Sequence, residues 1–160
     1  MDYVYLGLGS NVHPRFNLRS GLRALERKFG RLRISPVYRN PAVGFAGDDF
    51  LNLAVRVRCN LKPLAMKEWL QALEDEHGRR RGGARFSNRT LDIDVLMYGD
   101  RMIEEPGLTL PRPDILKYAH VLKPLAELAP RLVHPVEKHS IAALWADFDA
   151  SEQPLTPTTL

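Results

Sequence analysis

The segment 50–59 is the feature that most restricts the fold, because its side chains alternate between two kinds of surface. In a β-strand, successive side chains point to opposite faces. One face of this strand therefore belongs to a hydrophobic core, and a layer of helices has to cover it. The apolar positions are Leu51, Leu53, Val55, Val57 and Cys59, and the opposite positions are Phe50, Asn52, Ala54, Arg56 and Arg58.

Two amphipathic helices and three further strand segments surround this strand. Apolar residues recur at helical spacing within 17–30 and within 63–78, where Asn17 and Pro63 suit the helix starts and Gly30 and Gly78 the ends. Strand patterns cover 3–8, 31–39 and 90–98, with an edge or a bulge expected at Pro36. The order is that of a split βαβ unit. We predict an α+β fold with a ferredoxin-like βαββαβ core, one antiparallel sheet with helices packed on it, and a mixed C-terminal extension.

The pattern beyond residue 98 is weaker, because prolines at 106, 111 and 113 interrupt it. Short helices are expected within 116–128 and 140–145. With 160 residues, 44% hydrophobic and 26% charged, the chain fits one globular domain. We predict a single domain over residues 1–150 and a frayed tail over 151–160.

Composition also restricts location and partners. A lone cysteine, Cys59, excludes disulfide staples and cysteine zinc sites. No apolar run approaches the roughly 20 residues of a membrane helix, and the first residues lack the pattern of a secretory signal. A cytoplasmic protein without a membrane partner is the expectation.

Asp92 and Asp94 flank Ile93 on the last strand of the core pattern. Their side chains point to the same face and start about 6.6 Å apart along the chain. Two such carboxylates repel each other unless a hard cation such as Mg²⁺ lies between them. A solvated strand face with alternating polar residues explains the pattern equally well.

An arginine-rich segment leads into this strand. Five arginines and no acid lie between Arg79 and Arg89, whereas the whole chain has a net charge of only +4, so the positive charge is local. The pair Gly82-Gly83 favours a loop that moves. Phosphoryl transfer needs both metal ions and guanidinium groups at the phosphates. The alternative is a solvated surface loop, which we favour for Arg80.

Other polar and aromatic side chains extend this region. Phe50 and Asn52 offer a stacking surface and an amide that both donates and accepts, which suits a flat heteroaromatic ligand. Gln71 and Glu74 share one helix face just before the arginine segment. Each pair is also compatible with ordinary surface residues.

The stretch Arg89-Thr90-Leu91-Asp92-Ile93-Asp94-Val95-Leu96-Met97-Tyr98-Gly99 resembles the R-T-L-D-[IL]-D-[IL]-L-x-[FY]-G stretch of the 6-hydroxymethyl-7,8-dihydropterin pyrophosphokinase family. The similarity extends over 5–11, 38–41, 50–52, 74–81 and 122–130. It implies transfer of diphosphate from ATP to the hydroxymethyl group of the dihydropterin, with release of AMP, in folate biosynthesis. It also implies two Mg²⁺ ions, small-molecule substrates without nucleic acid, and a monomer.

The resemblance assigns roles to residues of this sequence. Asp92 and Asp94 match the metal-binding aspartates, and Arg79 and Arg89 match catalytic arginines. The ATP-binding residues that it implies are Gln71, Glu74, Arg81 and Arg85, with Arg112 as a positive donor in place of a histidine and Lys117 as a partial replacement for a lost arginine. The pterin-binding residues that it implies are Asn40, Pro41, Val43, Phe50 and Asn52, with His120 as the stacking partner in place of an aromatic residue.

The segment 110–122 departs from the family pattern L-P-H-P-R-x-x-x-R-x-F-V-L. Arg112 stands in place of a histidine, Tyr118 in place of an arginine, and His120 in place of an aromatic residue. A diverged paralogue with an altered pterin substrate or weakened activity is therefore one alternative. A more remote one is an RNA-binding module, although the usual RNA-binding stretch is missing and two aspartates on the sheet would repel phosphates.

Overall fold

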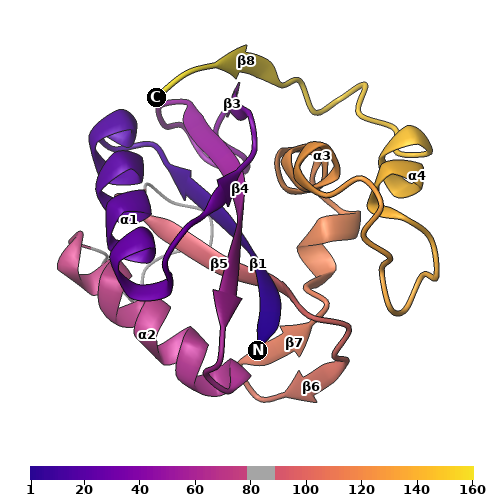
Figure 1. Cartoon of the computed structure of the whole chain (residues 1–160). Coiled ribbons are helices and arrows are strands. Elements are labelled where there is room, and N and C mark those ends of the chain that lie inside the picture. The colour runs from indigo at the N-terminus through magenta and orange to yellow at the C-terminus, as the bar shows by residue number, and fades with distance from the viewer. Residues whose placement is uncertain (79–88) are drawn as a thin grey trace.

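The computed structural model describes residues 1–78 and 89–160 (Figure 1). Its helices and strands follow the predicted order through the first 98 residues. The helices are α1 (Pro14–Phe29), α2 (Pro63–Glu76), the short 3₁₀ helix η1 (Pro113–Leu116), α3 (Ala119–Leu128) and α4 (Ile141–Ala146). The strands are β1 (Asp2–Ser10), β2 (Arg33–Ile34), β3 (Val37–Asn40), β4 (Phe50–Cys59), β5 (Asp92–Tyr98), β6 (Ile103–Glu105), β7 (Leu108–Leu110) and β8 (Thr156–Thr158).

The main sheet has the order β5-β1-β4-β3-β8, with β2 also paired to β4, and neighbouring strands are antiparallel. The first and third strands of the βαββαβ unit thus lie at its centre, as in ferredoxin-like folds. Helices α1 and α2 lie on one face of this sheet, and α3 and α4 on the other (Figure 1). The predicted α+β class is confirmed.

The interruption between β2 and β3 is a bulge, as expected at Pro36. Ile34 pairs with Val55 and Tyr38 with Asn52, so four steps on one strand oppose three on the other. Ser35 holds both sides together: its N–H donates to the Ala54 carbonyl at 2.9 Å, and its Oγ accepts from the Ala54 N–H at 2.8 Å. Pro36, which has no N–H to donate, therefore destabilises the sheet only slightly.

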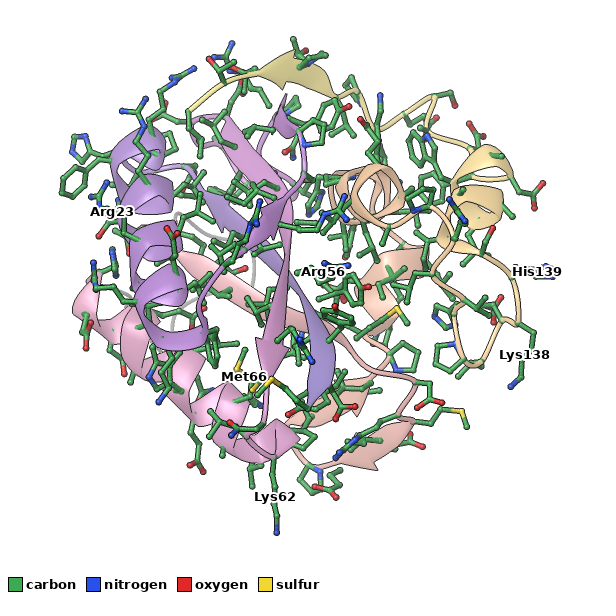
Figure 2. The ribbon with its side chains drawn as sticks, viewed as in Figure 1. Arg23, Arg56, Lys62, Met66, Lys138 and His139 are labelled. Atoms are coloured by element: carbon green, nitrogen blue, oxygen red, sulfur yellow. The ribbon has the colours of Figure 1, made fainter. Side chains whose placement is uncertain are left out.

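The face under α1 and α2 carries the main hydrophobic core. The apolar side of β4 packs there as predicted, and α2 contributes Met66, whose side chain is fully buried. Figure 2 shows Met66 directed into the protein, whereas Arg23 and Lys62 point to solvent. The buried members are Val4, Leu6, Leu8, Leu18, Leu25, Val37, Leu51, Leu53, Val55, Val57, Cys59, Met66, Leu70, Leu73, Leu91, Ile93, Val95, Tyr98, Leu108 and Leu110.

A second bulge lies in β5. Leu6 pairs with Val95 and Tyr5 with Met97, so Leu96 has no partner on β1. The extra residue reverses the alternation. Tyr98 turns into the main core, where its hydroxyl donates to the Leu61 carbonyl, and Met97 turns to the opposite face. The strand predicted over 90–98 would, with strict alternation, place Met97 on the same face as Ile93. That prediction is wrong after residue 96.

The second face is only partly covered. Helices α3 and α4 pack on it around side chains of β1, β4 and β5. This smaller core contains Tyr5, Ala54, Leu96, Met97, Ile115, Leu122, Leu125, Ala126 and Ile141. The strand ends that carry Phe50, Asn52, Asp92 and Asp94 extend past it. They remain open to a pocket.

The prediction of a frayed tail is wrong for the last residues. Strand β8 pairs with β3, with Pro157 opposite Tyr38 (Figure 1). Arg15 of α1 donates to Thr159 O at 3.0 Å and to Thr158 Oγ1 at 3.1 Å. The segment lacks a strong strand pattern of its own, but the free edge of β3 provides its backbone partners.

Across 1–78 and 89–160, no helix is both long enough and apolar enough to cross a membrane.

Candidate active site

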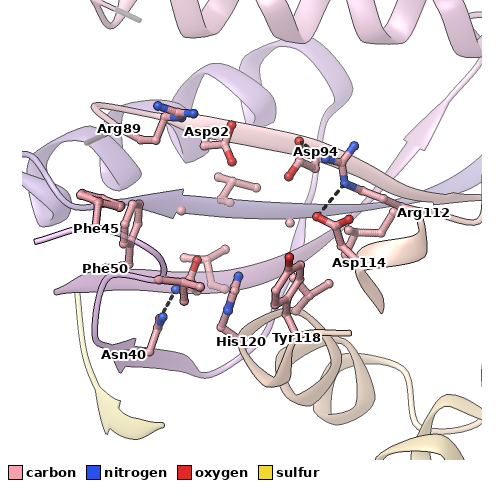
Figure 3. Close-up of a pocket in the computed structure, with 18 residues that line it drawn as sticks. Asn40, Phe45, Phe50, Arg89, Asp92, Asp94, Arg112, Asp114, Tyr118 and His120 are labelled. Carbon is pink, nitrogen blue, oxygen red and sulfur yellow. Dashed lines mark hydrogen bonds and ion pairs between the residues drawn. The ribbon is translucent and has the colours of Figure 1, made fainter. Parts of the chain in front are cut away.

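A pocket of about 390 Å³ lies where the strands extend beyond the second core (Figure 3). Its walls come from the central strands, the loop after β3 and the segment that leads into α3. It is lined by Gly7, Leu8, Gly9, Asn40, Val43, Phe45, Phe50, Asn52, Leu53, Arg89, Asp92, Asp94, Leu96, Arg112, Asp114, Tyr118, His120 and Val121.

Two amides form one wall of this pocket. The Nδ2 atom of Asn52 donates to Oδ1 of Asn40, and Asn40 Nδ2 donates to the Pro41 carbonyl at 3.0 Å. Both side chains are buried, so their orientation is fixed before any ligand arrives. Gly9 is required beside them, because a Cβ atom there would lie 2.7 Å from Asn52 Oδ1.

Aromatic side chains stand next to these amides. Phe50 packs edge-on against Phe45, with ring centroids 6.3 Å apart, and His120 stacks on Tyr118 at 5.3 Å. Burial lowers the pKa of His120, although the carboxylates of Asp114 and Asp92 oppose that shift. A neutral imidazole is favoured, and it can present a flat face to another ring.

The two aspartates of β5 form the acidic end of the pocket. Their cross-strand neighbours on β1 are Gly9, opposite Asp92, and Gly7, opposite Asp94, so β1 itself places no side chain directly opposite either carboxylate. Burial, and then repulsion from Asp92, raise the pKa of Asp94 to about 8. The pair resists carrying two negative charges, which is the environment that a bound cation relieves.

Arginines flank this pair on both sides (Figure 3). Arg112 Nη2 lies 3.5 Å from Asp94 Oδ1, and Arg112 Nε lies 3.3 Å from Asp114 Oδ2. Burial lowers the pKa of Arg112, but the carboxylates outweigh this and raise it, so the guanidinium stays charged. The backbone of Arg89 is held by Asn11, whose Oδ1 accepts from Arg89 N–H at 2.7 Å and whose N–H donates to Arg89 O at 3.0 Å.

A second pocket, of about 160 Å³, adjoins the same strand on the α2 side. It shares Asp92, Asp94 and Arg112 with the first pocket, and α2 contributes Lys67, Gln71 and Glu74 to it. Glu74 is 4% exposed, and its Oε2 accepts from the Ile93 N–H at 2.8 Å. It therefore fixes the backbone between the two aspartates.

Within the described residues, no group of three or more His, Cys, Asp and Glu side chains is arranged to hold a metal ion. Magnesium usually takes one or two protein carboxylates and completes its shell with waters and substrate phosphates. The pair Asp92 and Asp94, in a pocket that leaves room for further ligands, fits that ion.

Most predicted site residues come together. The first pocket contains Asn40, Val43, Phe50, Asn52, Arg89, Asp92, Asp94, Arg112 and His120, and the second contains Gln71 and Glu74. Pro41 and Lys117 line neither pocket, and Lys117 is exposed at the end of η1. Arg79, Arg81 and Arg85 lie outside the described residues.

The sequence reasoning assigned no role to Phe45, Lys67, Asp114 or Tyr118 at the site. Phe45 lies in a glycine-containing loop, so only its apolar character pointed to a ligand. Asp114 and Tyr118 stand where the resembling family has arginines, and the family pattern therefore directs attention away from them. Lys67 shares a helix face with Gln71 and Glu74, which is the signal that could have found it.

Comparisons with known proteins agree with this geometry. Residues 5–130 match the model of the 7,8-dihydro-6-hydroxymethylpterin-pyrophosphokinase family. A 2-amino-4-hydroxy-6-hydroxymethyldihydropteridine pyrophosphokinase of Pseudomonas aeruginosa is 39% identical over 140 residues, which cover 85% of this chain and 86% of the relative. One of Aquifex aeolicus is 34% identical over 138 residues, covering 85% and 86%.

Solved structures share the fold at low sequence identity. A Plasmodium falciparum HPPK-DHPS, wild type with STZ-DHP, matches with a TM-score of 0.72 at 15% identity, covering 94% of this chain and 42% of the solved one. An HPPK-DHPS in complex with substrates matches with a TM-score of 0.73 at 13% identity, covering 94% and 44%. This chain spans less than half the length of these solved chains.

Proposed function

Because this chain belongs to the 7,8-dihydro-6-hydroxymethylpterin-pyrophosphokinase family, we propose that it transfers diphosphate from ATP to the hydroxymethyl group of 6-hydroxymethyl-7,8-dihydropterin, releasing AMP, in folate biosynthesis. One observation carries the proposal at the level of atoms. Two pockets of different character share Asp92, Asp94 and Arg112. Two ligands that fill these pockets would meet at the carboxylate pair.

The pterin occupies the larger pocket in this proposal. Phe50 and the neutral ring of His120 provide flat surfaces for stacking, and the fixed amides of Asn40 and Asn52 hydrogen-bond the edge of the ring. Val43 and the neighbouring Pro41 belong to the loop that borders this pocket. The hydroxymethyl group then points toward Asp92.

ATP occupies the smaller pocket and extends its phosphates to the shared end. Gln71 and Lys67 line the nucleotide side, and Arg112 and Arg89 contact the transferring group. Arg79, Arg81 and Arg85 are assigned to the same phosphates by the resemblance, and Lys117 partly replaces an ATP-binding arginine that this chain lacks. Glu74 acts by holding the β5 backbone that presents both aspartates.

Asp92 and Asp94 hold two Mg²⁺ ions in this proposal, and the ions, when bound, neutralise charge on the phosphate oxygens. The substrate hydroxyl attacks the β-phosphorus in line. A pterin O–Pβ bond forms, the Pβ–O bond to the α-phosphate breaks, and AMP leaves as the hydroxyl proton is lost to solvent. No covalent intermediate on the protein is needed. The side chains contribute by aligning the two substrates and by stabilising the charge that develops.

The decisive test is to incubate the purified protein with ATP, MgCl₂ and 6-hydroxymethyl-7,8-dihydropterin and to separate the nucleotides. We expect AMP and the pterin diphosphate in equal amounts. ADP as the sole product would contradict diphosphate transfer. Omission of the pterin is the matched control, because AMP formed without it would indicate ATP hydrolysis.

A diverged paralogue is the second candidate, because Arg112, Tyr118 and His120, the three departures from the family pattern, all line the larger pocket. Binding of the standard pterin with no turnover would favour it. We further propose that the chain acts as a cytoplasmic monomer on small molecules only. Elution as a dimer in size-exclusion chromatography, or salt-sensitive retention on immobilised RNA that persists with Mg-ATP, would contradict this.

A further inference from the structure

Arg112 lies in the wall between the two pockets, where it contacts two acids through different nitrogen atoms. Its Nη2 faces Asp94 Oδ1 at 3.5 Å, and its Nε faces Asp114 Oδ2 at 3.3 Å. Asp94 lines both pockets, whereas Asp114 lines only the larger one. One guanidinium is thus shared between a carboxylate of the proposed metal pair and a carboxylate outside it.

The backbone fixes both ends of this contact. Arg112 N–H donates at 2.8 Å to the carbonyl of Leu96, the bulge residue without a partner on β1. Asp114 lies in η1, where its carbonyl accepts from the N–H groups of Lys117 and Tyr118, both at 3.1 Å. The anchored backbones keep the side chains of Arg112 and Asp114 within reach of each other at the junction of the pockets.

This arrangement sets a competition at Asp94. A cation at Asp94 competes with the guanidinium, because both are attracted to the same carboxylate and two positive charges held close together repel each other. A guanidinium without another partner would then either block the cation or move into solvent. The carboxylate of Asp114 offers the alternative partner within the reach that Arg112 already has.

We propose that Asp114 is a positioning residue that acts through Arg112. It holds the guanidinium at the junction of the two pockets. Arg112 can then give up its ion pair with Asp94 when a divalent cation binds there, and it still lies beside the substrate phosphates. The inference rests on the proposed function for the cation and the phosphates. It assigns this task to Asp114, a residue to which the family resemblance gives no role.

The first test measures binding of Mn²⁺ to the protein without nucleotide, from the loss of the free Mn²⁺ signal in electron paramagnetic resonance. In Asp114→Asn the guanidinium of Arg112 has only Asp94 as an ion-pair partner and competes more strongly with the cation. We therefore expect Mn²⁺ to bind about fivefold more weakly. Asp114→Glu retains a carboxylate and should restore most of the affinity. Thermal unfolding of each variant checks that the fold is intact.

A double-mutant cycle separates this role from a direct effect of charge. Arg112→Gln removes the competing cation and should tighten Mn²⁺ binding, and adding Asp114→Asn to it should then change little. An equal fivefold loss in both backgrounds would mean that Asp114 acts on the cation by its own charge. That result would overturn the proposal, as would Mn²⁺ binding that no Asp114 variant changes.

Steady-state kinetics provide the second readout. Asp114→Asn should raise the KM for Mg-ATP and the Mg²⁺ concentration needed for half-maximal rate, with a smaller change in the KM for the pterin. If the wild-type protein forms AMP but Asp114→Asn leaves Mn²⁺ affinity unchanged, the proposed function stands and this inference fails. If the double-mutant cycle gives the expected Mn²⁺ affinities but the wild-type protein forms no AMP, only the proposed function fails.

Discussion

The two faces of the sheet are built from the same strands and differ in almost everything else. On the face of α1 and α2, Leu51, Leu53 and Ile93 are at most 5% exposed in a continuous core. On the other face their immediate neighbours Phe50, Asn52, Asp92 and Asp94 line a pocket. One face contributes burial of apolar area, and the other keeps charged groups partly desolvated.

This difference shows how a small chain separates stability from chemistry. Burial of the Asp94 carboxyl, which raises its pKa, is unfavourable for folding, and the apolar residues one step along the strand offset it. Adjacent residues should therefore give opposite phenotypes when they are changed. The following predictions test that separation.

The largest effect is expected from Asp92→Ala and Asp94→Ala. Each should lower kcat/KM by about 10³-fold or more, because the proposed Mg²⁺ ions would lose a ligand. The folded structure should remain, as judged by circular dichroism and thermal unfolding. Asp100→Ala, an exposed acid in the turn after β5, is the matched control and should retain activity. Retained activity in both pocket variants would refute the metal assignment.

The core face should respond in stability instead. Leu51→Ala leaves a cavity under α1 and α2, and we expect it to lower the free energy of unfolding by about 3 kcal/mol, measured by urea denaturation. Its neighbour Phe50→Ala should instead raise the KM for the pterin, with a smaller loss of stability. If Leu51→Ala changed the pterin KM as much as Phe50→Ala does, the two faces would not be functionally separate.

Glu74 connects the two faces, since it comes from the helix layer and holds the strand of the aspartates. Glu74→Leu leaves the buried N–H of Ile93 without its acceptor and should cost about 2 kcal/mol of stability. Glu74→Gln keeps an acceptor and should behave almost like the wild type in urea denaturation. An unchanged midpoint for Glu74→Leu, together with a raised KM for ATP, would indicate a nucleotide contact instead.

The smallest effect concerns pH and the metal-free protein. The pKa of Asp94 is raised from 3.8 to about 8 in the folded state, so between these values the folded chain keeps a proton that the unfolded chain has lost. Stability from this group is therefore present at low pH and is lost as pH rises toward 8. Asp94→Asn should stabilise the metal-free protein by about 1 kcal/mol at pH 8 and less at pH 5. Equal thermal midpoints of wild type and variant at pH 8 would contradict it.

The sequence was sufficient for the order of the elements and for most of the pocket. Alternation in 50–59 and helical spacing in α1 and α2 are local signals, and each survives packing because one face of every element has to be buried. The D-x-D spacing likewise determines that Asp92 and Asp94 share a face, whatever lies around them.

What the sequence did not show depends on partners that are distant along the chain. The bulge at Leu96 is set by pairing with β1, and β8 forms because β3 and Arg15 supply its contacts. The contact of Asp114 with Arg112 needs the turn of η1 and the anchoring of Arg112 to Leu96. None of these leaves a periodic signal in the sequence.

The bulge in β5 also separates the solvent-accessible pocket from the apolar interior of the second core. It places Leu96 and Met97, consecutive in sequence, in the second core together, and Leu96 lines the pocket as well. Two apolar side chains, Leu96 in the pocket wall and Met97 in the second core, therefore lie two and three residues beyond Asp94. With low-polarity material on one side, the field of the carboxylates is directed outward into the pocket, toward the place where cations and phosphates would arrive.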